Sequence, residues 1–294
     1  MVIPRTKNAL LKQGENFSWV DRRPPQGPGR VDTFNPYKMI FGFDLVQDDS
    51  IGTADLPSLW NQKIRQGMWL HWDGNNNRVE ERNKSAAIGA GAAEKSLDLA
   101  GMKRVEDWIW ELKPPPFPAD RINRSRVEGG KMIYDQHCAE CHDPGGKWVG
   151  QVTDIEQIGT DPERMNSFTS ALAEKMNTIG EGYPWKFSHF RKTRGYASMP
   201  LDGLWLRSPY LHNGSVPTLF DLLAPPEHRP KVFHRGYDVY DFQKVGFVSA
   251  GPEAERLGFK YDTADRGNGN GGHTYGTGLN PEEKGDLLEY LKTL

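Results

Sequence analysis

The sequence predicts a mainly α-helical protein with long irregular loops, divided into two parts. Three observations support this prediction. Helical periodicity recurs along the chain, most clearly at residues 125–137 and 281–294. The 32 glycines and 21 prolines predict long irregular segments between the helices. A proline-rich break at residues 113–118 separates a first part, residues 1–118, from a second part, residues 119–294.

One helix is expected directly before the break and another soon after it. The helix predicted over residues 104–112 has its apolar side chains on one face: Val105, Trp108, Ile109 and Leu112. The helix predicted over residues 125–137 has an apolar edge formed by Met132 and Ile133, to which Tyr134 contributes.

The second helix leads into the most informative motif of the chain, Cys138-Ala139-Glu140-Cys141-His142. This Cys-x-x-Cys-His run is the attachment signature of c-type haem, and it holds the only two cysteines of the sequence. Each thiol can form a thioether to one haem vinyl group, and the adjacent imidazole then serves as the proximal iron ligand. A zinc site would need two more ligands, and a thioredoxin-type motif would not need the histidine. We therefore expect one covalent haem c with its iron.

The C-terminal segment predicts a helix that completes this haem domain. Asn280 can cap it, with Pro281 in the first turn and Glu283 at the capping-box position. Leucines then recur at helical spacing, namely Leu287, Leu288, Leu291 and Leu294. In a cytochrome c fold the last helix crosses the first, so the two helices predict a cytochrome c-like domain over residues 119–294. Two unrelated surface helices are the alternative.

The sixth ligand of the iron decides the function, because a strong ligand makes an electron carrier and an open position admits oxygen or peroxide. Met199 lies on a loop flanked by glycine and proline and is one candidate ligand, with a core methionine as the alternative. His273 lies in the glycine-rich residues 267–276, which could approach a flat macrocycle closely; a solvated turn is the alternative. For His212 we expect a structural or supporting role.

Tryptophans are further candidates to lie beside the porphyrin. Trp148, Trp185 and Trp205 could pack around the ring, and ordinary core positions are the alternative for each.

A weak internal repeat links the two parts of the chain. Residues 56–74 and 201–214 both begin Leu-x-x-Leu-Trp, and both continue to an aromatic residue, Leu-His, and Asn or Asp before Gly. If the repeat is real, residues 1–118 are a partial cytochrome c-like module without a haem motif of its own. Chance similarity is the alternative.

The residues from Met199 to Leu223 resemble the C-terminal haem module of the bacterial di-haem cytochrome c peroxidase superfamily. The resemblance is closer to the branch that contains rubber oxygenase, in which a Gly-His-x-Tyr-Gly-Thr segment like Gly272 to Thr277 precedes the last helix. That branch is thought to have a bis-histidine C-terminal haem, which implies His142 with His273. The methionine ligand of the peroxidases maps onto Pro226 and is not carried over.

The resemblance also bears on function. It implies substrate chemistry at a first haem, whose motif this chain lacks, and electron relay at the second haem, whose motif it retains. We therefore favour an electron-transfer cytochrome with six-coordinate iron. The alternative is a peroxidase- or oxygenase-like enzyme, or its relay half, with His212 and Arg207 as acid–base candidates. A third reading makes residues 1–118 a docking platform, and whether the chain is an enzyme stays open.

Composition restricts the partners and the location. A net charge of −2 does not indicate a nucleic-acid surface, and no apolar run approaches the ~20 residues of a transmembrane helix. The first residues, Met1 to Arg5, do not lead into an apolar signal segment. Covalent haem attachment nevertheless predicts the periplasm, so we expect a mature form or a fragment. The expected partner is a redox protein, either another cytochrome or a dehydrogenase.

Overall fold

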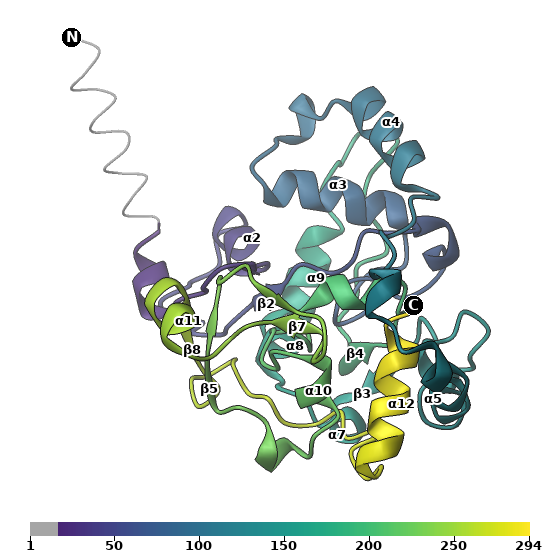
Figure 1. The fold of residues 1–294 in the computed structure, drawn as a ribbon. Helices are drawn as coiled ribbons and strands as arrows, with labels where there is room; N and C mark the ends of the chain where they lie inside the picture. The colour runs from purple at the N-terminus through teal and green to yellow at the C-terminus, as the bar shows by residue number, and fades with distance from the viewer. Residues whose placement is uncertain (1–16) are drawn as a thin grey trace.

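A computed structural model describes residues 17–294 of the chain. The expectation drawn from Met1 to Arg5 lies outside this range. Figure 1 shows a chain of short elements joined by long loops. The helices are α2 (Asn35–Ile40), α3 (Val79–Gly89), α4 (Leu99–Ile109), α5 (Arg124–His137), α6 (Ala139–His142), α7 (Ile155–Ile158), α8 (Glu163–Ser167), α9 (Ser170–Met176), α10 (Leu219–Leu222), α11 (Pro252–Leu257) and α12 (Pro281–Leu291).

The strands are short and pair only two by two among the described residues. They form four antiparallel sheets, β1 (Arg30–Asp32) with β2 (Thr53–Asp55), β3 (Val152–Asp154) with β4 (Gly195–Ala197), β5 (Val232–Arg235) with β8 (Phe259–Asp262), and β6 (Tyr240–Asp241) with β7 (Gly246–Phe247). These ladders give the long loops partners for their backbone donors and acceptors. The fold is therefore mixed, and the prediction of a mainly α protein is not confirmed.

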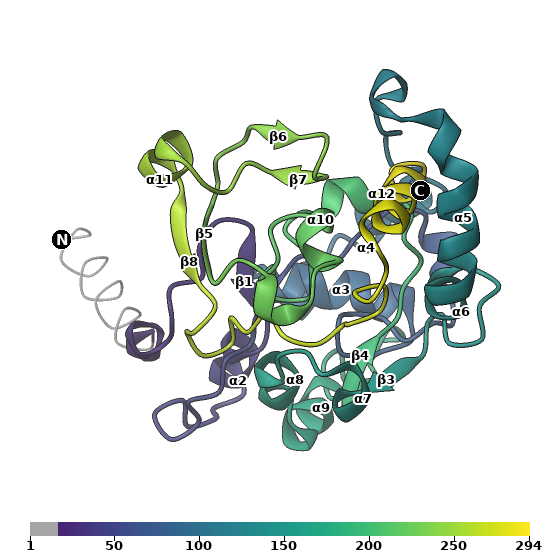
Figure 2. The same ribbon diagram turned by 60° about the horizontal axis from the view of Figure 1, so that its bottom comes forward.

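The helix that leads into the haem motif packs against the C-terminal helix, as Figures 1 and 2 show for α5 and α12. The rings of Tyr134 and Tyr290 have centroids 5.0 Å apart across this contact. Arg126 on α5 also forms an ion pair with Asp286 on α12. The backbones come close at Gly130, where an added Cβ would lie 2.0 Å from the carbonyl oxygen of Asp286. Both helices are thus where the sequence predicted them.

The first hydrophobic core lies beneath α12. Asn280 caps this helix by accepting hydrogen bonds from the backbone N–H groups of Glu282 and Glu283, and the Glu283 carboxylate accepts one from the Asn280 N–H in return. This confirms the predicted capping box. The buried members of the core are Phe117, Tyr134, Leu204, Tyr210, Val216, Leu219, Leu223, Val245, Leu287, Leu288 and Leu291.

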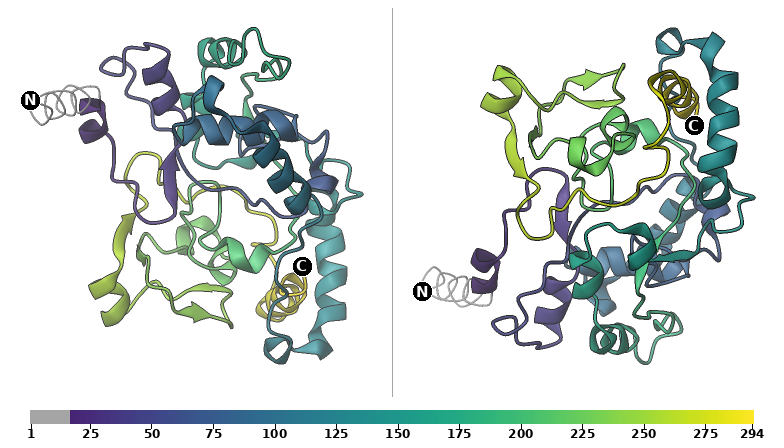
Figure 3. Two further views of the ribbon diagram at one scale, coloured as in Figure 1. Left: turned by 90° about the horizontal axis from the view of Figure 1, so that it is seen from above. Right: turned by 90° about the horizontal axis from the view of Figure 1, so that it is seen from below.

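The second hydrophobic core combines residues from both sides of the break at 113–118. Phe34, Tyr37 and Ile88 come from the first part, and they pack with Phe168, Leu172, Ala173, Met176, Ile179, Phe187 and Phe190 of the second. In the two views of Figure 3 the purple N-terminal segments accordingly lie beside the teal segments that carry α8 and α9. The two predicted parts share this core, and the domain boundary at 118 stays a prediction.

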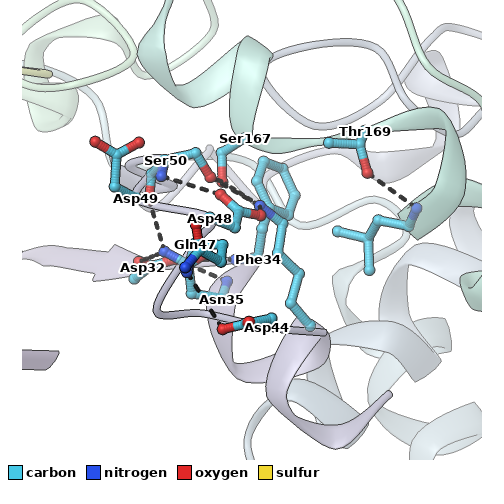
Figure 4. A network of polar contacts seen from close by, with 12 residues as sticks. Asp32, Phe34, Asn35, Asp44, Gln47, Asp48, Asp49, Ser50, Ser167 and Thr169 are labelled. Carbon is cyan, nitrogen blue, oxygen red and sulfur yellow. Dashed lines mark hydrogen bonds and ion pairs between the residues drawn. The ribbon is translucent and has the colours of Figure 1, made fainter. Parts of the chain in front are cut away.

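A buried polar network fastens α2 to α8 (Figure 4). The ammonium group of Lys38 is fully buried and contacts the Asp48 carboxylate at 2.6 Å, the Ser50 hydroxyl at 2.8 Å and the Ser167 hydroxyl at 3.3 Å. Asp32 accepts hydrogen bonds from the backbone and the side chain of Asn35. A buried charge is costly unless hydrogen bonds or an opposite charge compensate for the lost water.

The helix expected over residues 104–112 is shifted towards the N-terminus. Asp98 accepts a hydrogen bond from the Gly101 N–H and starts α4 at Leu99, and the helix ends at Ile109. Of the predicted apolar face Ile109 is buried, whereas Val105 and Trp108 are 58% and 67% exposed. Helical periodicity predicted that a helix exists here, but it did not predict which of the apolar side chains other segments would bury.

Within residues 17–294, none of the helices combines the length and the apolar character that crossing a membrane requires.

The close approach of α5 and α12 predicts that Gly130→Ala destabilises the protein, although alanine is the better helix former. The new Cβ would collide with a backbone carbonyl that cannot turn away, and overpacking of this kind costs about 1–3 kcal/mol. Gly129→Ala in the same helix is the control, because its Cβ would meet only the end of the Asp286 side chain at 3.2 Å. Thermal unfolding measures both; a Gly130→Ala protein as stable as the wild type would contradict the packing.

Candidate haem site

One large pocket lies between α5–α6, α10, α12 and the loops around residues 196–212 and 273. Its empty space is about 1380 Å³ including the open mouth. Its walls are mostly apolar, with leucines of α10 and α12 on one side. Among the described residues, Arg207 is the only arginine, lysine or carboxylate that lines it. Such a pocket suits a large, flat, mostly apolar ligand.

The haem motif enters this pocket on a single helical turn. Helix α5 ends at His137, and the N–H groups of Cys141 and His142 then donate to the Cys138 carbonyl at 3.2 and 3.0 Å. Both cysteines and His142 line the pocket. Burial raises the pKa of the Cys138 thiol to about 11, so this group is a thiol at neutral pH.

His142 is held by a hydrogen bond behind its ring. Its Nδ1 lies 2.8 Å from the carbonyl oxygen of Met199, so a neutral ring with the proton on Nδ1 donates to that oxygen. Burial lowers the pKa of this imidazole, which is therefore neutral at pH 7. A carbonyl in this position selects the tautomer and leaves Nε2 free to bind a metal.

His273 reaches the pocket from a strained part of the glycine-rich loop. Its φ of 44° lies in the left-handed region, which a histidine adopts only when its surroundings enforce it. The His273 N–H donates to the Ile158 carbonyl at 2.8 Å. Gly272 passes so close to the loop after α7 that an added Cβ would lie 2.2 Å from the carbonyl carbon of Gly159. Burial lowers the pKa of His273 to about 4, so this imidazole is also neutral.

The two imidazoles face each other at a separation that fits one metal ion. Their ring centroids are 6.2 Å apart and their planes are inclined by 45°. With a metal–nitrogen distance of about 2 Å and about 1 Å from that nitrogen to the ring centre, two imidazoles on one metal have centroids about 6 Å apart. The hydrogen bond of His142 uses Nδ1, and Nδ1 of His273 is buried without a hydrogen-bond partner among the described residues, so each ring has a nitrogen left for a metal. The residues present therefore fit an iron between His142 and His273.

All five residues that the sequence singled out as haem ligands or attachment points line this one pocket: Cys138, Cys141, His142, Met199 and His273. Met199 meets His142 through its backbone carbonyl, on the Nδ1 side of that ring. His273 meets His142 through its ring. The geometry thus favours His273 over Met199 as the partner ligand.

Several lining residues were not predicted. Trp72 lines the pocket and donates from Nε1 to the Asp55 carbonyl at 2.7 Å. Tyr196 stacks on His212, with centroids 4.0 Å apart and planes 18° from parallel. Burial holds the pKa of His212 well below its usual range, so this ring stays neutral. This stacked arrangement agrees with the supporting role expected for His212.

The predicted tryptophans lie elsewhere. Trp185 packs against the second core, and Trp205 packs on Phe117 and Tyr240 and donates to the Pro115 carbonyl. Trp148 is 45% exposed. None of the three lines the pocket in the described part of the chain. Their ordinary core or surface positions were the alternative, and composition alone could not separate the two.

The internal repeat explains why Trp72 was missed. Leu70 bridges to Asn76 and Tyr210 bridges to Val216, so each pair closes a turn of the same length. His71 and Leu211 follow with positive φ angles of 61° and 66°, and Gly74 and Gly214 with 63° and 64°. The equivalent of His212 is therefore Trp72 rather than His71. The two Leu-His pairs of the sequence repeat are therefore offset by one residue in the structure. Aligning those pairs did not place Trp72 opposite His212.

Comparisons with known proteins give one family match and two uncharacterised relatives. Residues 195–234 match the family model described as RoxA-like, cytochrome c-like. The chain is also similar to two uncharacterised proteins of Sinorhizobium fredii, y4iJ and y4iM. Identity to y4iJ is 27% over 366 residues, covering 92% of this chain and 60% of y4iJ. Identity to y4iM is 32% over 220 residues, covering 66% of this chain and 49% of y4iM.

This chain thus spans 60% of the length of y4iJ and 49% of the length of y4iM. The family match supports a relationship to RoxA-like c-type cytochromes. Because a cytochrome c-like domain binds haem c, the match also implies a haem c with its iron in this protein.

Proposed function

We propose that this protein is a c-type cytochrome that transfers electrons through one six-coordinate haem. Cys138 and Cys141 attach the haem, and His142 and His273 bind its iron from the two sides. The single observation that carries the proposal is the pair of neighbouring imidazoles of His142 and His273, whose ring centroids are 6.2 Å apart. Bound haem c would supply a one-electron couple at its iron.

The protein's own groups hold the ligands still and keep water away. The Met199 carbonyl orients His142, and the loop after α7 supports the strained backbone of His273. Leucines of α10 and α12 cover one wall of the pocket. Rigid ligands and an apolar wall limit rearrangement when the charge on the site changes, and burial tunes the potential.

In this proposal Arg207 would also interact with a carboxylate of the haem. Its Nη2 donates to the carbonyls of Pro200 at 3.0 Å and Asp202 at 2.7 Å. It also pairs with the Asp202 carboxylate at 3.5 Å, so a haem carboxylate placed near it would share this guanidinium with Asp202. A buried carboxylate needs such a partner.

We further infer a periplasmic location and a protein redox partner, either another cytochrome or a dehydrogenase. Covalent haem attachment supports the location. A docking role for residues 1–118 and an origin of these residues as a partial haem-less module are compatible with their shared core with the rest of the chain.

A peroxidase- or oxygenase-like function is the second candidate. It is favoured by one observation, that His212 and Arg207 both line the haem pocket. Against it, burial keeps His212 neutral and the ring lies flat against Tyr196, so it is poorly placed to exchange protons.

The ligand assignment predicts different outcomes for His273→Ala and Met199→Ala. Loss of the imidazole should convert the ferric haem from low-spin to predominantly high-spin. Met199→Ala should stay low-spin, because its backbone carbonyl still holds His142. Low-temperature electron paramagnetic resonance of the ferric proteins measures the spin state. A high-spin Met199→Ala with a low-spin His273→Ala would reverse the assignment.

Replacing both cysteines by serine is expected to abolish covalent attachment. The Cys138→Ser/Cys141→Ser protein should lose haem on a denaturing gel, whereas each single variant keeps one thioether. His137→Ala is the control, since this exposed neighbour forms no thioether. Haem staining and the pyridine haemochrome spectrum detect the bond; haem retained by the double variant would disprove attachment at the motif.

Peroxide turnover separates the two candidate functions. With both axial positions occupied, the wild-type protein should not consume hydrogen peroxide in the presence of an electron donor. His273→Ala, with an open position, should gain slow turnover. Rapid turnover by the wild type that is lost in His212→Ala would instead support the enzyme.

A further inference from the structure

We propose that Arg229 is the positioning residue that locks His273 in its iron-binding conformation and adds a fixed positive charge beside that ligand. The inference rests on the proposed function, because it assumes that His273 binds the iron. Arg229 follows a short 3-10 turn, Pro226–His228, and is 2% exposed.

The guanidinium group uses its full set of donors on backbone carbonyls. Three acceptors belong to the glycine-rich loop: Asn270 at 2.6 Å, Gly272 at 2.8 Å and His273 at 3.1 Å. Two lie at the end of α10, Leu222 at 3.2 Å and Ala224 at 3.2 Å. A guanidinium has five N–H groups, and five carbonyls accept from it here. The side chain therefore ties the His273 loop to the end of α10.

The loop needs such a tie. A non-glycine residue held in the left-handed region, as His273 is at a φ of 44°, is strained, and neighbouring contacts must offset that strain. Between residues 270 and 273, the described hydrogen bonds other than those of Arg229 are the His273 backbone N–H to the Ile158 carbonyl and the Asn270 side chain to the Pro230 carbonyl. Removing the guanidinium would leave three loop carbonyls without this donor.

The charge of Arg229 is not neutralised by an ion pair with any described residue. A guanidinium stays protonated in proteins, so a positive charge lies permanently next to the His273 backbone. A fixed positive charge favours the reduced iron, which carries one positive charge less than the oxidised iron. Arg229 should therefore raise the reduction potential as well as hold the ligand.

Arg229→Met and Arg229→Lys separate these two effects. Cyanide must displace His273 from ferric iron, so its apparent affinity rises with the fraction of protein in which the imidazole has dissociated. We expect Arg229→Met to bind cyanide at least about tenfold more tightly than wild type. Its potential should be lower. Arg229→Lys keeps the charge but cannot span both segments, so cyanide affinity should rise while the potential stays near that of the wild type.

Arg266→Met is the matched control. Arg266 directly precedes the glycine-rich loop but pairs with Asp49 and Glu163 at the surface. Its cyanide affinity should stay within about twofold of the wild type. If Arg229→Met fails to fold, Arg229→Lys decides the question by the same titration.

Two results would overturn different steps. Wild-type cyanide affinity in the Arg229 variants, with a high-spin His273→Ala, would refute the role of Arg229 and leave the haem ligation intact. A low-spin His273→Ala would refute the ligation itself.

Discussion

The proposed haem site depends on holding two neutral imidazoles, inclined by 45° to each other, at the separation that one metal ion requires. His142 and His273 come from opposite ends of the haem domain, so no local element can set the 6.2 Å between their rings. Backbone groups hold both residues: the Met199 carbonyl contacts the ring of His142, and the Ile158 carbonyl accepts from the backbone N–H of His273. Carbonyls of ordered loops hold a ligand more rigidly than mobile side chains do, which suits a site where ligands must not move.

The rest of the fold supplies that rigidity with little regular structure. Helix α5 presents the haem motif, and α12 fixes α5 through a contact that only glycine permits at residue 130. Elsewhere, buried arginines connect loops: Arg229 fastens the His273 loop to α10, and Arg235 joins Asp55 to the Gly214 carbonyl. Guanidinium groups suit this role because one planar group can satisfy several carbonyls at once.

Short-range patterns predicted the parts of the molecule that short-range physics determines. The Cys-x-x-Cys-His motif, the helix into it and the capping box at Asn280 involve residues within a few turns of each other, and the structure has all three. Long-range contacts were beyond the sequence. The exposed face of α4, the paired short strands and the pocket position of Trp72 depend on which distant segment packs where. The resemblance already implied His273 rather than Met199 as the second ligand; both residues line the same pocket, and the ligand assignment stays a prediction.

Two equivalent 3-10 turns, one on each side of the proline-rich break, show that residues before the break contact the segment beside the proposed haem site. Asn61 and Gly203 both have a left-handed backbone conformation. Each directly precedes a 3-10 turn, and the two turns end at Arg65 and Arg207. These two arginines occupy equivalent positions and converge on Pro200 and Asp202, directly after Met199. One guanidinium from each part of the chain thus holds the segment that follows Met199, whose carbonyl contacts His142. Separating the two parts would remove Arg65 and leave Asp202 with half of its buried cationic partners, next to the residue on which the orientation of His142 depends.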